Sequence, residues 1–127
     1  VAALGRVYTQ ERAQAFTAWG DTVRDRVNDQ FRQQKLPMQA TGIGSILSPH
    51  FVSRPIRSPD DIPEASRHMG RLLHRALQLD GVLVCARGDI YLSLPMTDAD
   101  IDQLLSALSA FGMQYGALIE KVARVET

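Results

Sequence analysis

The sequence predicts an α+β fold, a two-layer sandwich in which helices cover one face of a small, mostly antiparallel sheet. Long stretches carry apolar residues every three or four positions, short apolar runs lie between them, and the links between these runs are too short for crossover helices. The expected order is helix, two strands, helix, two strands, helix. We expect residues 1–127 to form a single domain, because 45% hydrophobic residues suffice for one core at this length.

The first helix is expected from about Gln10 to about Gln34. Thr9 can cap its N-terminus, and one face is apolar while the rest is charged. Leu36-Pro37 ends it, because proline cannot continue a helix. Two strands are then expected around the Gly42-Ile43-Gly44 turn, at Met38–Thr41 and Ser45–Val52.

The second helix is expected to start at Ser58-Pro59, since proline fits the first helical turn, and to close at Asp80-Gly81. Its apolar stripe consists of Ile62, Ala65, Met69, Leu72, Leu73, Ala76 and Leu77. Two further strands are expected at Val82–Cys85 and Ile90–Leu94, joined by a short turn.

The third helix is expected to begin after Thr97, which can act as its cap. Acidic residues in the first turn complement the helix dipole, and apolar residues recur on the inward face. The acidic residues are Asp98, Asp100 and Asp102, and the apolar ones are Ile101, Leu104, Leu105, Leu108 and Phe111.

Charge and composition limit the possible partners. Fourteen basic and fourteen acidic side chains cancel, so no long-range field attracts nucleic acid or anionic lipid. A single cysteine cannot form an internal disulfide, and no apolar run approaches the roughly 20 residues that span a bilayer. We therefore expect no nucleic-acid partner, no membrane partner and a cytoplasmic location.

A series of motifs in consistent order resembles the C-terminal small domain of class III aminotransferases, which use pyridoxal phosphate. The motifs are Gly20-Asp21-x-x-Arg24, Thr41-Gly-Ile-Gly-Ser45, Pro49-His-Phe51, Arg54-Pro-Ile-Arg-Ser-Pro-Asp60, the Arg87-Gly88 turn, Leu92-Ser-Leu-Pro95 and Thr97-Asp-x-Asp-Ile-Asp102. The likeness is greatest to the glutamate-1-semialdehyde aminotransferase (aminomutase) group and fades after Phe111. It implies the small-domain fold of fold-type I enzymes, with the large cofactor-binding domain absent from these residues.

This resemblance implies a C-terminal domain fragment that shapes the substrate side of a larger enzyme's active site. Pyridoxal phosphate requires a lysine in a desolvated setting. Lys35, at the polar exit from the first helix, and Lys121, in the expected C-terminal tail, are most simply surface lysines. We therefore expect no catalytic or cofactor-binding residue here, no cofactor on this chain alone and an inactive fragment. The large domain of the parent chain would be its partner, and exposed apolar surface should favour a homodimer or self-association.

The resemblance also indicates a substrate-side loop at Arg87 and Gly88, although a solvated turn is an equally good interpretation of these residues. Some members of the family hold a substrate carboxylate with an arginine at the position of Leu92. The leucine argues against an ornithine or 4-aminobutyrate type of substrate and favours the aminomutase-like group.

Other apparent motifs have simpler explanations. Gly42-x-Gly44 lacks the lysine and the following helix of a phosphate loop, and Asp98-x-Asp100-x-Asp102 lacks the glycine and glutamate of a calcium loop. The three histidines, His50, His68 and His74, lack the spacing of a helical metal pair, so no metal site is expected. We expect His50 to be a structural or interface residue and Cys85 to be buried packing.

A second hypothesis comes from a basic stripe on the second helix. Arg67, Arg71 and Arg75 recur every four residues on the face opposite the leucines. Such a stripe is usually a solvated face. The alternative function is a stand-alone α+β binding or interaction module without catalysis, which would hold a partner or small ligand on its sheet face or on this stripe.

Overall fold

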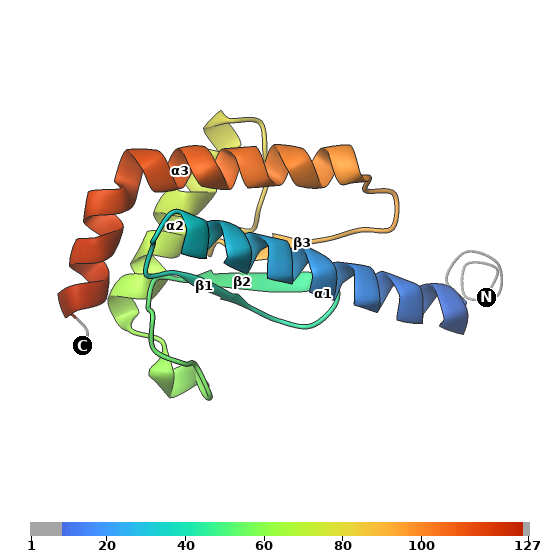
Figure 1. Cartoon of the computed structure of the whole chain (residues 1–127), viewed down its shortest axis with the longest axis horizontal. Helices are drawn as coiled ribbons and strands as arrows, with labels where there is room; N and C mark the ends of the chain where they lie inside the picture. The colour runs from blue at the N-terminus through green and yellow to red at the C-terminus, as the bar shows by residue number, and fades with distance from the viewer. Residues whose placement is uncertain (1–8, 126–127) are drawn as a thin grey trace.

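The computed structural model describes residues 9–125 and confirms the predicted α+β fold (Figure 1). In chain order its elements are α1 (Gln10–Gln33), β1 (Gln39–Thr41), β2 (Ile46–His50), the 3₁₀ turn η2 (Pro59–Asp61), α2 (Glu64–Leu79), β3 (Ile90–Tyr91) and α3 (Asp98–Val125). Residues 1–8 and 126–127 of the expected domain lie outside the described part. None of the helices within residues 9–125 is long and apolar enough to cross a membrane.

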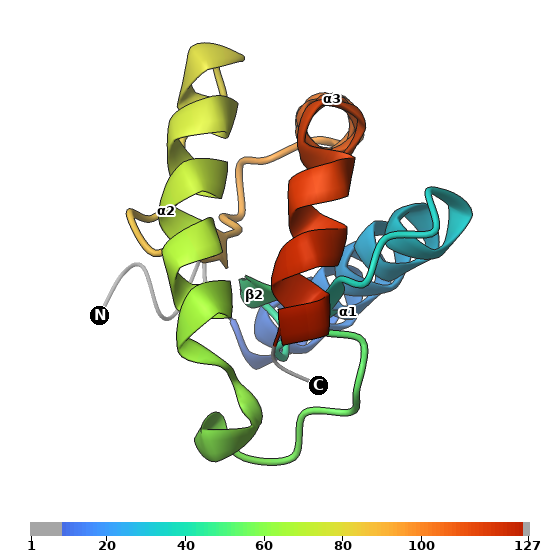
Figure 2. The same cartoon turned by 90° about the vertical axis from the view of Figure 1, so that its left-hand side faces the viewer.

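The sheet has the order β1-β2-β3, and both pairs are antiparallel. Ala40 pairs with Pro49, and Leu47 pairs with Ile90, and all four residues are buried. The helix α1 packs against β1, α2 packs against β2, and α3 packs against both helices (Figures 1 and 2). The buried face of the sheet and the three helices therefore enclose one core.

The core consists of apolar side chains from every helix and from the sheet. Burying each large side chain stabilises the fold by about 1.5–3 kcal/mol. The largest fully buried side chains are Phe31, Phe51, Leu47, Leu73, Leu77, Ile101, Leu108, Ile119, Val23, Val27 and Val52. Most of them come from stretches whose helical or strand periodicity is visible in the sequence.

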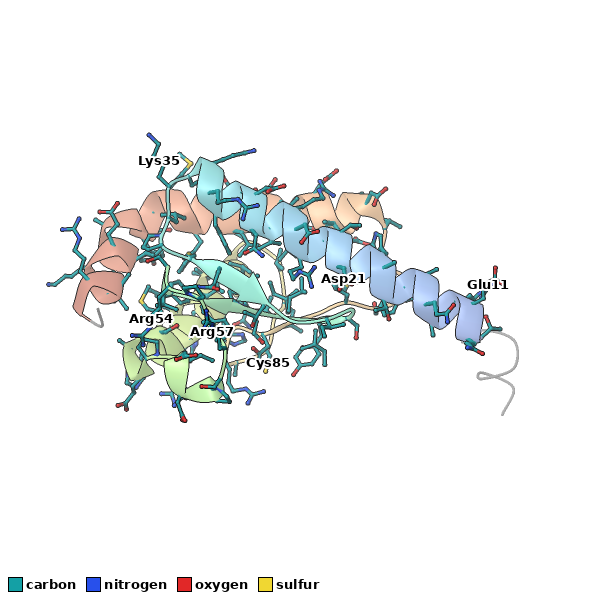
Figure 3. The ribbon with its side chains drawn as sticks, turned by 60° about the horizontal axis from the view of Figure 1, so that its bottom comes forward. Glu11, Asp21, Lys35, Arg54, Arg57 and Cys85 are labelled. Atoms are coloured by element: carbon teal, nitrogen blue, oxygen red, sulfur yellow. The ribbon has the colours of Figure 1, made fainter. Side chains whose placement is uncertain are left out.

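Both ends of α1 follow from local chemistry. The Thr9 hydroxyl accepts a hydrogen bond from the backbone N–H of Arg12 at 3.2 Å and caps the N-terminus. At the other end Lys35 adopts a left-handed conformation, with φ of 56°, and the N–H of Leu36 bonds back to the carbonyl of Phe31 at 3.0 Å. This is the arrangement that commonly closes helices. Lys35 therefore serves as an exposed helix stop at the end of α1 (Figure 3).

The strand predicted at Val82–Cys85 is wrong, since residues 9–125 contain three strands and the prediction had four. The carbonyl of Val84 lies 2.9 Å from Nδ1 of His74 on α2, and the N–H of Cys85 bonds across the turn to the carbonyl of Asp89. The polar backbone groups of this segment are thus used by a helix side chain and a tight turn, not by a neighbouring strand.

Two smaller differences concern the helices. α2 begins at Glu64 and not at Ser58, because the residue before a proline is held extended. Ile62, which precedes Pro63, has φ of −94° and ψ of 110°, and it separates η2 from α2. Lys121 was expected in a C-terminal tail, but α3 continues through it.

Candidate functional site

The predicted substrate-side turn and part of the predicted arginine stripe meet in one cleft of about 490 Å³. Arg67 and Arg71 of α2 line it together with Arg87, whereas Arg75 does not. The remaining lining residues are Ser48, Pro49, His50, Ile62, Ser66 and Asp89. Two features that lie apart in the sequence therefore belong to one site.

Close packing on α2 fixes the backbone of the Arg87-Gly88 turn. A Cβ atom added at Gly70 would lie 2.0 Å from the carbonyl oxygen of Arg87, so only glycine allows this approach. Gly88 has φ of +95°, which side-chain-bearing residues rarely adopt, and its N–H bonds to the carbonyl of Cys85 at 2.7 Å. Helix and turn are thus in direct backbone contact at the edge of the cleft.

The side chain of Arg87 extends from this turn into solvent. The Arg87 side chain is 76% exposed, and its guanidinium forms an ion pair of 3.0 Å with the carboxylate of Asp89, whose side chain is 18% exposed. The nearby Asp89 charge raises the pKa of Arg87, so this group is cationic at any physiological pH. An exposed pair of this kind adds little stability. It orients a cation whose planar guanidinium has five N–H donors, the geometry that suits a carboxylate.

His50 brings a neutral polar group to the same cleft. Its Nε2 lies 2.9 Å from the hydroxyl oxygen of Thr41, and the ring is half-buried. Burial lowers the pKa of His50, and the charge of Asp89 opposes this only in part. The ring is therefore largely uncharged near pH 7.

Sequence reasoning missed the cleft roles of Ser48, His50 and Asp89. Ser48 and His50 alternate on β2 and therefore share the face opposite the core. That alternation was a usable signal for the two residues. Asp89 follows the turn, and nothing in the local sequence distinguishes it from any solvated turn residue.

The described residues do not fit a pyridoxal phosphate site. Lys35 is the exposed helix stop of α1, and Lys121 is exposed on α3, so neither amine has a desolvated setting. Within residues 9–125 no group of three or more His, Cys, Asp or Glu side chains could hold a metal ion. Cys85 is only partly buried, which corrects the expectation of buried packing.

A second cleft of about 390 Å³ is mainly apolar and lies between residues 81–84, β3 and the start of α3. Several large apolar side chains at this place are exposed to solvent. They are Leu83 (81% exposed), Tyr91 (49%) and Met96 (36%), with Leu94 (41%) next to them. The structure thus has the exposed apolar surface that the sequence led us to expect.

Comparison with known proteins relates this chain to transaminases, although no protein-family model matches it. It is 36% identical over 120 residues to the β-phenylalanine transaminase of Variovorax paradoxus. The aligned region covers 94% of this chain and 28% of that protein. It is 29% identical over 109 residues to an uncharacterised aminotransferase of Schizosaccharomyces pombe, and this alignment covers 85% of this chain and 24% of that protein.

Solved structures agree with this relation. The crystal structure of a β-phenylalanine aminotransferase from Variovorax paradoxus superposes with a TM-score of 0.87 at 37% identity, over 92% of this chain and 27% of that one. An ω-transaminase from Sphaerobacter thermophilus superposes with a TM-score of 0.67 at 24% identity, over 83% of this chain and 24% of that one, and this second likeness concerns the fold alone.

The chain spans about a quarter of the length of the relatives it matches. Its fold matches the C-terminal domain of the transaminase, and its sequence is similar to the two relatives named above over most of its length.

Proposed function

We propose that this chain is the C-terminal domain of a larger, pyridoxal-phosphate-dependent aminotransferase that acts on a β-amino acid of the β-phenylalanine kind. The observation that supports this most strongly is the agreement of sequence and fold with one enzyme, the β-phenylalanine transaminase, at 36% identity over 94% of the chain and a TM-score of 0.87. The lysine that carries the cofactor would come from the rest of the polypeptide, since Lys35 and Lys121 are both exposed.

In this proposal the domain shapes the substrate side of the active site through Arg87 and Gly88. The turn is pressed against Gly70 of α2, so the Arg87 side chain starts from a fixed backbone. Its guanidinium is exposed and is oriented by Asp89. A fixed cation of this kind suits the carboxylate of an amino acid, because arginine can donate two parallel hydrogen bonds to it.

The apolar cleft beside β3 is the surface we assign to the parent chain's large domain or to a second copy. Leu83, Tyr91 and Met96 form its exposed apolar rim. Exposed apolar patches commonly mark interfaces. A homodimer and a cytoplasmic location belong to the same proposal.

The aminomutase reaction, which converts glutamate-1-semialdehyde, is a second candidate. Leu92 supports it, because this residue stands where ornithine- and 4-aminobutyrate-type members of the family carry an arginine. In the structure Leu92 is 7% exposed and belongs to the core, so that position presents an apolar side chain. The alternative of a stand-alone binding module without catalysis requires that the native product contain little more than these residues.

The test is to purify the gene product at its native length, measure its bound pyridoxal phosphate, and assay β-phenylalanine and glutamate-1-semialdehyde as substrates. We expect bound cofactor and transamination of β-phenylalanine with a 2-oxo acid as acceptor. Turnover of glutamate-1-semialdehyde instead would favour the aminomutase. A native product of about this chain's length, without cofactor, would favour the binding module.

The role of Arg87 is tested in the same enzyme with Arg87→Gln. Loss of a charged hydrogen bond should lower kcat/KM for β-phenylalanine about tenfold to a hundredfold. An amine of the same shape that lacks the carboxylate should be unaffected. Arg75→Gln is the matched control, because Arg75 is an exposed arginine outside the cleft. Equal losses for both substrates would show that Arg87 does not bind the carboxylate.

A further inference from the structure

The cleft beside Arg87 contains cationic groups that the proposed substrate role does not use. Arg67 and Arg71 are one helical turn apart on α2, and both line the cleft. Like charges four residues apart on a helix repel each other. The repulsion between these two exposed arginines is small, and an anion between them would replace it with attraction.

The carboxylates of the chain do not supply that anion. The cleft has three arginines and one acid, Asp89, and this acid is already paired with Arg87 at 3.0 Å. Within residues 9–125 Arg71 makes no hydrogen bond or ion pair, and Arg67 only donates to the carbonyl of Pro59 at 3.4 Å. By contrast, Arg24, Arg26 and Arg32 on α1 are each paired with an aspartate.

Polar groups of β2 complete the opposite wall. Ser48 and His50 both line the cleft, and Nε2 of His50 is already bonded to the hydroxyl group of Thr41. Among the described residues Nδ1 of His50 has no hydrogen-bond partner. Guanidinium donors from α2 and polar side chains from β2 thus line the cleft from two elements, and the ring of His50 is a donor at Nδ1 in the tautomer whose Nε2 accepts from Thr41.

We propose that this cleft binds a compact dianion of the phosphate type, held mainly by Arg67 and Arg71, beside the substrate carboxylate that Arg87 would bind. A phosphate group carries nearly two negative charges near pH 7, which matches the charge left when the Arg87–Asp89 pair is set aside. The cleft volume of about 490 Å³ lies in the range of small-molecule sites. The ligand could be inorganic phosphate or the phosphate end of a small metabolite.

The experiment is calorimetric titration of the native-length gene product with inorganic phosphate at low ionic strength. We expect saturable binding that weakens as salt is added. Arg71→Gln should weaken it about tenfold or more, because one charge-assisted contact is lost. Arg75→Gln should leave it unchanged within about twofold, since Arg75 lies on the same stripe but outside the cleft. Titration with a simple phosphomonoester then distinguishes the two sources.

Several results would overturn this inference. They are an absence of phosphate binding, equal binding by the parent protein and Arg71→Gln, and displacement of phosphate by β-phenylalanine, which would assign the cleft to the substrate. Equal or tighter binding of a dicarboxylate would overturn the phosphate assignment. The proposed enzyme function is tested by cofactor content and turnover, so it can fail while phosphate still binds through Arg71.

Discussion

Two helices of this domain each contact a tight turn through a glycine, and the two contacts are secured differently. On α1 a Cβ atom at Gly20 would lie 1.9 Å from the carbonyl oxygen of Gly44, and on α2 one at Gly70 would lie 2.0 Å from that of Arg87. Side chains hold the first turn as well: Asp21 accepts from the N–H of Gly44 at 3.0 Å. The described structure shows no such helix-to-turn side-chain bond at Gly70.

The first of these contacts has a structural role, whereas the second lies at the edge of the candidate functional site. Arg24 donates to the carbonyl of Gly42 at 2.9 Å, so the β1–β2 turn is bonded to α1 at both of its glycines. The Arg87-Gly88 turn is in backbone contact with Gly70 of α2, and among the described residues no hydrogen bond joins an α2 side chain to residues 86–88. The motifs Gly20-Asp21-x-x-Arg24 and Gly42-Ile-Gly44 therefore have a joint structural purpose, since each binds the other.

The largest expected effect is on the first contact. Gly20→Ala should lower the free energy of unfolding by roughly 3 kcal/mol or more, because the new methyl group meets backbone that Asp21 and Arg24 hold in place. Gly70→Ala should cost less, about 1–3 kcal/mol, because displacing the Arg87-Gly88 turn breaks no side-chain hydrogen bond to α2. Chemical denaturation of the purified variants measures both losses.

Gly116 on α3 provides the control for these two substitutions. Its nearest neighbour is a methyl group of Leu36 at 3.8 Å from the added Cβ, so Gly116→Ala meets no obstacle. It should stabilise the protein by about 0.5–1 kcal/mol, because alanine favours the helix. An equal or larger loss at Gly70 than at Gly20 would contradict the distinction between a turn held by side-chain hydrogen bonds and a turn held by backbone packing.

How far the sequence predicts this molecule depends on whether a signal is local. The periodic apolar residues predicted all three helices and the strands around Gly42-Ile-Gly44. The apolar run Val82–Cys85 led to the wrong prediction of a strand. Its composition does not show that His74 of α2 lies near the carbonyl of Val84. The cleft could not be predicted from the sequence, because it depends on a tertiary contact between Gly70 of α2 and the Arg87-Gly88 turn. The two glycines carry no such meaning until the fold is known.

The next effect in size concerns the side chains that hold the first turn. Asp21→Ala removes the acceptor for the N–H of Gly44, a buried residue, and should cost about 1–3 kcal/mol of unfolding free energy. Asp25→Ala is the matched control on the same helix, because Asp25 also pairs with Arg24 but does not contact the turn. It should cost less than about 1 kcal/mol, as exposed ion pairs do. Equal losses would mean that Asp21 stabilises the protein through its pairing with Arg24 and not through its hydrogen bond to Gly44.

The smallest expected effect is a pH dependence of the stability, and it comes from His50, which lines the cleft beside Arg87. Burial lowers the pKa of His50 below its ordinary 6.5, so the unfolded chain binds its proton more readily than the folded one. The stability from this residue is therefore fully present above pH 6.5 and is lost as the pH falls from there through the folded-state pKa. Denaturation between about pH 7.5 and about pH 5 should show a decline that is smaller in His50→Gln than in the parent protein. Parallel declines in the two proteins would mean that His50 is solvated in the folded state, and the same result would weaken its assignment to the wall of the cleft.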